Sequence, residues 1–310
     1  MKVLVPEFAG TRCWACLSDR IAALIEAAGA VPREMSHAVG VTGLAADFDG
    51  EPKPPAAGVL VLPVRGAIVP RGSWLSRALG WTALDGLRAQ LRAAVADPGI
   101  SAIVLDVDSP GGLVEGLAET AELLRALRDV KPIMAISNAL CASAAYYMAA
   151  QASEVWATVD SMTGSIGTVL VHAEFSKALE AEGIAVTVIR SPEGKFQGNE
   201  FEALAPETRA RFQEFADNFT AQFVADVAKG RGVTGAKVGK DFGRGDVLLA
   251  KEALAAGMVD KIGTLDQVIA RAGTRRKGLR AEQPAPAPLA ARAGLSPENR
   301  RRWFELEAGA

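Results

Sequence analysis

The chain has 310 residues, of which 49% are hydrophobic and 23% charged, and its net charge is −2. This composition is typical of a globular protein, and the small net charge argues against a nucleic-acid partner. The N-terminus lacks the apolar run of a signal peptide, and no window has the ~18 uninterrupted apolar residues that suggest a membrane span. Three cysteines provide no disulfide framework. We therefore expect a cytoplasmic chain without a transmembrane anchor.

The sequence indicates neither a metal site nor a cofactor. Cys13 and Cys16 have C-x-x-C spacing, but a zinc site needs two further ligands. The chain has two histidines, His37 and His172, and both are far from this pair in the sequence. We therefore predict no metal and no cofactor.

Predicted elements begin with an amphipathic helix at about 18–28 and a proline-rich linker at 51–55. From residue 59 onward, apolar strands alternate with helices. The predicted strands are Val59–Val64, Ala102–Val107, Ile133–Ser137, Glu154–Thr158 and Val186–Arg190. The predicted helices are Ala83–Ala96, Leu113–Arg128, one starting at Ser143, and Glu174–Glu182. This order predicts an α/β fold whose parallel sheet is covered by helices on both faces.

A long helix is predicted from Pro206 to Lys229. Proline suits its first turn, and Gly230 suits its C-terminal cap. One face carries a stripe of apolar residues at spacings of three and four: Phe212, Phe215, Phe219, Phe223 and Val227. Such a stripe predicts either core packing or a subunit interface.

Three parts follow from these patterns. Residues 1–55 are predicted to be an N-terminal helical segment and linker, and residues 56–272 the main domain. Residues 273–310 are rich in Ala, Pro and basic residues, which predicts a flexible tail.

Ser143 and Lys195 are the candidate chemical groups. Ser143 follows a predicted buried strand and lies among small residues at the start of a helix. Upstream, residues 108–112 (Asp-Ser-Pro-Gly-Gly) predict a strand, a tight glycine turn and a helix N-terminus, whose free N–H groups can stabilise an oxyanion. A serine hydroxyl needs a base, and a buried lysine can serve in place of histidine. Phe196 and Phe201 are expected to supply the apolar surroundings of Lys195.

Each signal also has an ordinary explanation when it is taken alone. Ser143 is compatible with a helix N-cap, which is a common role for serine before an apolar helix. The glycine pair is compatible with a simple turn. Lys195 lies between glycines and is compatible with a solvated loop.

Together, the segments from about Val59 to Val268 resemble the signal peptide peptidase A family of serine peptidases, which share the fold of the Clp protease and crotonase. The resemblance rests on four segments in the family's order: 108–112, 142–146 (Ala-Ser-Ala-Ala-Tyr), 163–167 (Thr-Gly-Ser-Ile-Gly) and 194–195 (Gly-Lys). Within the family, Ala-Ser-Ala-Ala-Tyr is similar to the phage head-maturation, or protein C-type, branch.

The resemblance implies a Ser–Lys dyad, an oxyanion hole and a residue that orients the base. The dyad is Ser143 and Lys195. The N–H groups of Gly111 or Gly112 and of Ala144 form the implied oxyanion hole, and Ser165 orients the lysine. The resemblance also implies a ββα superhelix with a parallel sheet covered by helices, a long C-terminal oligomerisation helix, and a homo-oligomeric ring.

The function expected from the resemblance is a serine endopeptidase that cleaves polypeptides, with a phage or prophage capsid or scaffold protein as the substrate, in the cytoplasm or in a phage procapsid. Three alternatives remain open. They are a cytoplasmic signal-peptide or protein quality-control peptidase, a crotonase-like acyl-CoA enzyme, and a non-catalytic capsid assembly protein. The Ser143 and Lys195 segments argue against the acyl-CoA enzyme.

Overall fold

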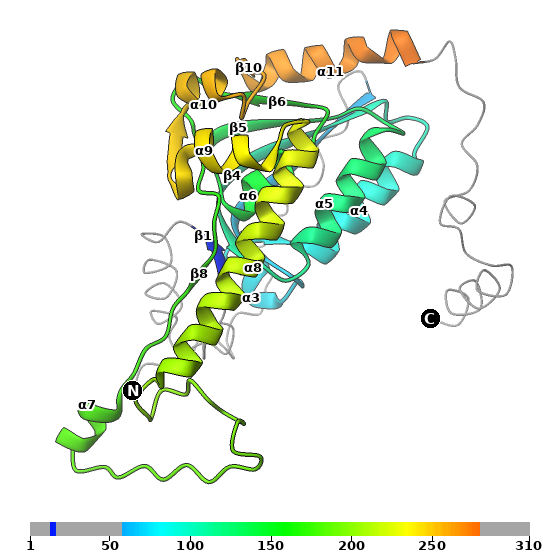
Figure 1. Ribbon diagram of the computed structural model, residues 1–310. Coiled ribbons are helices and arrows are strands. Elements are labelled where there is room, and N and C mark those ends of the chain that lie inside the picture. Colours follow the sequence, from blue (N-terminus) through cyan, green and yellow to red (C-terminus); the bar gives the residue numbers. More distant parts are fainter. Residues whose placement is uncertain (1–12, 17–57, 280–310) are drawn as a thin grey trace, which may run out of the picture. The chain divides into compact units, whose positions relative to one another are not determined.

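The computed structural model describes residues 13–16 and 58–279 (Figure 1). The chain divides into two compact units, 1–273 and 274–310. Only residues 274–279 of the second unit are described. The predicted helix at 18–28, the linker at 51–55 and the tail beyond residue 279 lie outside the described residues.

One sheet forms the centre of the first unit, and its main path runs β10-β6-β5-β4-β1-β8. Its long strands pair in parallel: β2 (Val59–Val69), β4 (Ala102–Leu113), β5 (Ile133–Ala142) and β6 (Glu154–Ala157). Shorter strands complete it: β1 (Cys13–Cys16), β3 (Thr82–Ala83), β7 (Met162–Gly164), β8 (Val169–Leu170), β9 (Val247–Leu249) and β10 (Lys261–Ile262). The predicted strands at 59, 102, 133 and 154 are confirmed.

The helices of the described residues connect and cover these strands (Figure 1). They are α3 (Trp74–Ala78), α4 (Leu84–Ala96), α5 (Leu117–Arg128), α6 (Ala144–Ala149), α7 (Ser176–Ala181), α8 (Pro206–Arg231), α9 (Gly235–Asp241), α10 (Ala250–Ala256) and α11 (Leu265–Leu279).

Two apolar layers pack on the two faces of the sheet. Alternate residues of β4 point to opposite sides, as the pleat requires. Leu105 belongs to the larger core, which includes buried residues of α4, α5, α6 and α8. Its neighbour Val104 belongs to a second cluster, with Val268 of α11. The prediction of a parallel sheet covered on both faces is therefore confirmed.

Three predicted details were wrong. Val186–Arg190 has no regular secondary structure and pairs with no described strand, so Val186 and Ile189 remain exposed, at 43% and 94%. The helix predicted from Leu113 begins at Leu117, because β4 continues through residue 113 by pairing with β1. The cap of α8 is Gly232, with φ 65°, and not Gly230.

A buried polar cluster holds α6 against the C-terminal half of α8. The Tyr147 hydroxyl donates a hydrogen bond to Asp226 Oδ2 at 2.6 Å, and Arg125 Nη2 lies 3.3 Å from Asp226 Oδ1. The rings of Tyr147 and Phe223 pack at a centroid distance of 4.6 Å. Burial raises the pKa of Asp226, but hydrogen bonds from Tyr147 and Gln222 and the Arg125 charge outweigh it and hold the pKa below its usual value.

We predict that Asp226→Asn lowers the free energy of unfolding by about 2 kcal/mol at pH 7, because it weakens a buried, charge-assisted cluster. The folded-state pKa of Asp226 is depressed, so its stabilisation is present above the unfolded-state pKa of about 4 and is lost as pH falls through the folded-state value. Urea unfolding at several pH values should therefore show the difference between wild type and variant shrinking as pH falls below ~4. Glu214→Gln, at an exposed position of α8, is the control. Equal losses in the two variants would contradict this prediction.

Candidate active site

Ser143 lies on a strained turn between β5 and α6. Its φ is 53° and its ψ is −118°, outside the regions favoured by residues with side chains. Its N–H donates to the Gly164 carbonyl at 2.7 Å, which holds the turn in place. The side chain makes no capping hydrogen bond, so the N-cap explanation fails. Its hydroxyl is buried and has no hydrogen-bond partner among the described residues.

The glycine pair lies on β4, on the strand next to β5. Ser109 is paired with Cys141, so Gly111, two residues further along the parallel register, is level with Ser143. The predicted turn and helix N-terminus are replaced by a strand: β4 continues through Gly112, and Gly111 within it has a φ of 100°, which residues with side chains rarely adopt. The Gly111 N–H donates to Ser109 Oγ at 3.1 Å.

Ala144 and Ser165 complete the surroundings of Ser143. Ala144 is the first residue of α6, so its N–H has no partner within the helix. Ser165 follows Gly164, whose carbonyl accepts the Ser143 N–H, and its own N–H donates to the Asp246 carbonyl at 2.8 Å. Its φ of 55° is a second strained position beside the serine. The structure thus brings Ser143, both glycines, Ala144 and Ser165 together.

Sequence reasoning did not single out Thr163, two residues before Ser165. It is paired with Cys141 across β5 and β7, and its hydroxyl is buried without a hydrogen-bond partner among the described residues. Thr163 was seen only as part of the motif at 163–167. Its unpaired hydroxyl arises from packing that no local pattern reveals.

Lys195 is not brought to Ser143 within one chain. It lies in the arm, which we define as residues 171–205, including α7. Figure 1 shows the segment between α7 and α8 at the far end of α8 from the sheet. Lys195 is exposed, and Phe196 beside it is 53% exposed. The expected apolar surroundings of the lysine are therefore not formed by Phe196 within the chain.

A cavity of about 370 Å³ lies between α5, α6 and α8, one helical turn beyond Ser143. Its lining includes Val114, Leu117, Tyr147, Thr168, Phe219 and Phe223. Val114 directly follows β4 and Thr168 directly precedes β8, so the cavity borders both strands. Two residues of the phenylalanine stripe line the cavity: Phe223 is buried, whereas Phe219 is 43% exposed.

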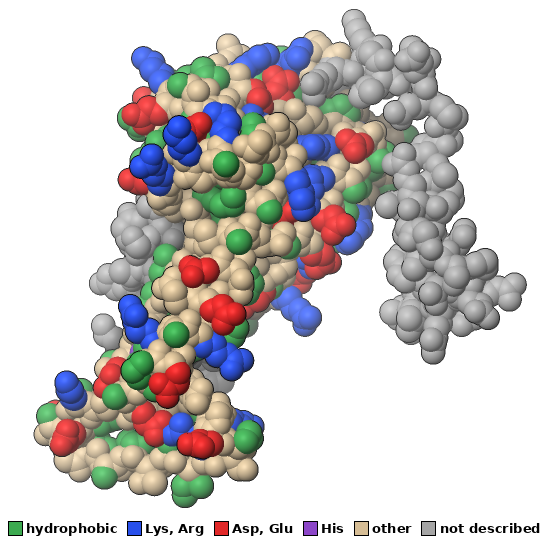
Figure 2. Space-filling model, viewed as in Figure 1, with side chains coloured by type: hydrophobic (Ala, Val, Ile, Leu, Met, Phe, Trp, Pro, Cys, Tyr) green, Lys and Arg blue, Asp and Glu red, His purple; other side chains and the backbone are tan. Residues whose placement is uncertain are grey.

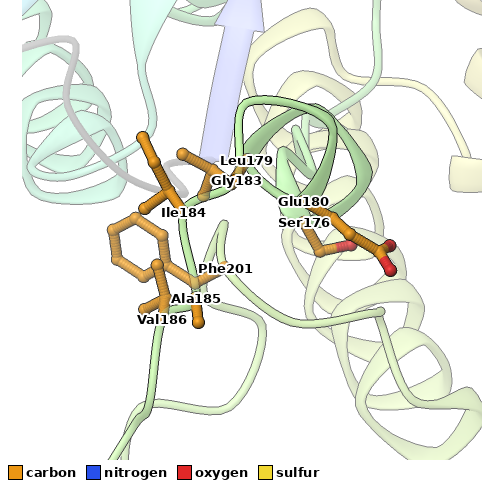
Figure 3. A pocket seen from close by; sticks show the side chains of 8 residues that line it. All are labelled: Ser176, Leu179, Glu180, Gly183, Ile184, Ala185, Val186 and Phe201. Atoms are coloured by element: carbon orange, nitrogen blue, oxygen red, sulfur yellow. The ribbon is translucent and has the colours of Figure 1, made fainter.

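A second cavity, of about 300 Å³, belongs to the arm and contains none of the predicted site residues. Figure 3 shows the side chains of Ile184, Val186 and Phe201 gathered on one side of it, with Ser176 and Glu180 of α7 on the other. Because it is remote from Ser143, we regard it as part of the arm's apolar surface.

A buried serine on a strained strand-to-helix turn, beside the free N–H group at the start of a helix, is the arrangement found in serine hydrolases. Comparison with known sequences agrees. The pattern of peptidase family S49 matches residues 125–279. The chain therefore belongs to peptidase family S49, a family of serine peptidases, and has the Clp protease/crotonase-like α/β fold.

Curated relatives include two phage proteins. The capsid assembly protease C of Escherichia phage lambda is 34% identical over 205 residues, covering 66% of this chain and 46% of the relative. The head-tail preconnector protein GP5 of Enterobacteria phage P21 is 34% identical over 206 residues, or 66% of this chain and 40% of that protein. A putative signal peptide peptidase SppA of Enterococcus faecium is 30% identical over 178 residues, covering 56% of this chain and 51% of the relative. The chain thus spans less than half the length of both phage proteins.

The described residues contain no group of three or more side chains suited to holding a metal ion. Within the same ranges, no helix is both long enough and apolar enough to cross a membrane.

We predict that Gly112→Ala disrupts the site by breaking the contact between β4 and β2. A Cβ at this position would lie 2.0 Å from the backbone oxygen of Ile68, a distance that requires the strands to separate. We expect a loss of at least 3 kcal/mol in the free energy of unfolding, as for a severe core clash. Gly86→Ala, in an open position on α4, is the control and should stabilise by about 0.5–1 kcal/mol. Thermal melts of both variants test this, and a Gly112→Ala protein as stable as wild type would contradict it.

Proposed function

We propose that the protein is a serine endopeptidase in which Ser143 is the nucleophile and Lys195 is the general base. The observation that carries this proposal is the buried, unpaired hydroxyl of Ser143 on a strained turn. A buried hydroxyl that is neither solvated nor hydrogen-bonded destabilises the fold, and groups of this kind are concentrated at functional sites. Membership of family S49 supports the same chemistry.

In the proposed reaction, Ser143 Oγ attacks the carbonyl carbon of a peptide bond as its proton passes to the neutral amine of Lys195. The N–H group of Ala144, with that of Gly111 or Gly112, stabilises the negative oxygen of the tetrahedral intermediate. The lysine then gives the proton to the leaving amine, and water releases the acyl group by the same steps in reverse order. Ser165 is the proposed positioning residue for the amine.

We further propose that a second copy of the chain supplies Lys195 to each Ser143. The arm that carries Lys195 exposes apolar side chains that a neighbouring subunit would cover; Phe175 is 52% exposed and Ile184 52%. Figure 2 shows hydrophobic side chains among charged ones at the end of the protein that holds α7 in Figure 1. Covering the arm would remove water from the lysine and favour its neutral form. A closed ring of identical subunits repeats this contact at every site.

The proposed substrate is a polypeptide, and the proposed setting is phage or prophage head assembly. The two phage relatives, whose names refer to a capsid assembly protease and a head-tail preconnector, support this setting. Because a putative signal peptide peptidase is also among the relatives, a role in protein quality control is the second candidate function for this chain.

We predict that Ser143→Ala abolishes proteolysis, with a loss of several orders of magnitude in kcat/KM, and leaves the fold intact, because the change deletes one unpaired hydroxyl. Cleavage of casein and of a capsid or scaffold protein encoded nearby is measured beside labelling by a fluorophosphonate. A wild-type protein that neither labels nor cleaves would instead favour a non-catalytic assembly role. A mutant that cleaves at the wild-type rate would remove Ser143 from the mechanism.

We predict that Lys195→Arg and Lys195→Ala are both nearly inactive, because arginine keeps the charge but does not release its proton in this pH range. Lys177→Arg, also in the arm, is the matched control and should keep activity. Mixing Ser143→Ala with Lys195→Ala subunits should restore part of the activity, since some sites then join an intact serine to an intact lysine. Active Lys195→Arg would exclude the base role, whereas inactive mixtures that have exchanged subunits would exclude the contribution between copies.

A further inference from the structure

The short N-terminal strand β1 occupies a particular position in the sheet. It pairs antiparallel with the glycine segment of β4, with Trp14 opposite Leu113, Ala15 opposite Gly112 and Cys16 opposite Gly111. On its other edge it pairs antiparallel with β8, with Trp14 opposite Val169. Residues 13–16 are thus inserted between two strands that they alone connect in the described part of the sheet.

The pairing places β1 on the same edge of β4 as Ser143. β4 has β2 on one edge, up to the pair Ile68–Gly112. The other edge is taken by β5 up to the pair Ser109–Cys141, and then by β1 from Gly111. β5 stops pairing with β4 where the chain turns into Ser143 and α6. Beyond that point β1 pairs with the same edge of β4. The strand therefore runs beside the serine and the glycine pair.

β1 runs in the direction expected for the part of a substrate that lies N-terminal to the cleaved peptide bond. From Trp14 to Cys16 the chain runs along β4 from Leu113 towards Gly111, the residue level with Ser143. A substrate strand bound here would run in the same direction, so that the carbonyl group of the bond to be cleaved lies nearest to the oxyanion donors. Extended peptides commonly bind proteins by adding a strand to a free sheet edge.

We propose that residues 13–16 occupy the substrate groove between β4 and β8, so that the N-terminal segment is a built-in competitor of polypeptide substrates. This inference rests on the proposed peptidase function, because it assigns the ligand class of that same site. The groove takes an extended backbone, and the cavity lined by Val114 and Thr168 borders it at the level of Trp14. A substrate strand enters only when β1 leaves.

A tethered competitor is effective even when its own contacts are few. Residues 13–16 belong to the same chain as the groove, and an intramolecular ligand can act at an effective concentration on the order of millimolar. Release of β1 should therefore lower the KM for a peptide substrate and leave kcat unchanged.

The test uses the full chain with Trp14→Pro, and Trp14→Val as its matched control. Trp14 is paired on both edges, so its N–H faces one of the two strands, and proline removes that donor. Valine keeps the N–H and favours a strand. We expect kcat/KM for an extended peptide to rise about tenfold in Trp14→Pro, through KM, and to stay near the wild-type value in Trp14→Val.

Hydrogen exchange tests whether β1 occupies the groove, and this measurement requires no catalytic activity. In a Ser143→Ala background, the amides of Val169 and Leu170 report on β1, because β8 pairs with no other described strand. In Trp14→Val we expect at least one of these two amides to be protected from exchange. In Trp14→Pro we expect that amide to lose its protection. Equal exchange in the two variants would overturn the inference, and so would an unchanged KM in an active enzyme that has lost the protection. Absence of peptidase activity in every variant would refute the proposed function instead, and the exchange result would still stand.

Discussion

The pairing of Gly112 of β4 with Ile68 of β2 is the constraint on which the site depends. A Cβ on Gly112 would lie 2.0 Å from the Ile68 oxygen, so only glycine allows the two backbones to pass at this distance. Pairing of β2 with β4 therefore continues beyond the irregularity at residues 65–67. Because β4 continues as a strand, Gly111 is level with Ser143, and β4 has an edge on which another strand can pair.

The second constraint is the unequal anchoring of α8. Its C-terminal half is held by the buried Asp226 and by Phe223, both in contact with Tyr147 of α6. Its N-terminal half is largely exposed and is joined to the arm that carries Lys195. A lysine in water keeps its proton and is no base. In our proposal, an isolated subunit is therefore inactive, and assembly completes the site by burying the lysine of one copy beside the serine of another.

The two proposals limit proteolysis at separate steps. In the first proposal assembly supplies the base, and in the second β1 controls entry to the groove. Both act through backbone or apolar contacts of modest size, which a partner or a competing strand can replace. For a peptidase that handles extended polypeptides, such control reduces cleavage of unintended chains before the assembly and its substrate are in place.

The sequence by itself determined the alternation of strands and helices, the parallel sheet, the family, and the position of Ser143 at a strand-to-helix junction. These features depend on apolar periodicity and short motifs, which are local. Only the tertiary structure decided that the glycine pair lies on a strand, that Val186–Arg190 forms none, and that Lys195 is remote from Ser143 within the chain. It also placed β1 on the edge of β4. Each of these depends on whether a distant segment is available to pair or pack, and local periodicity contains no record of such partners.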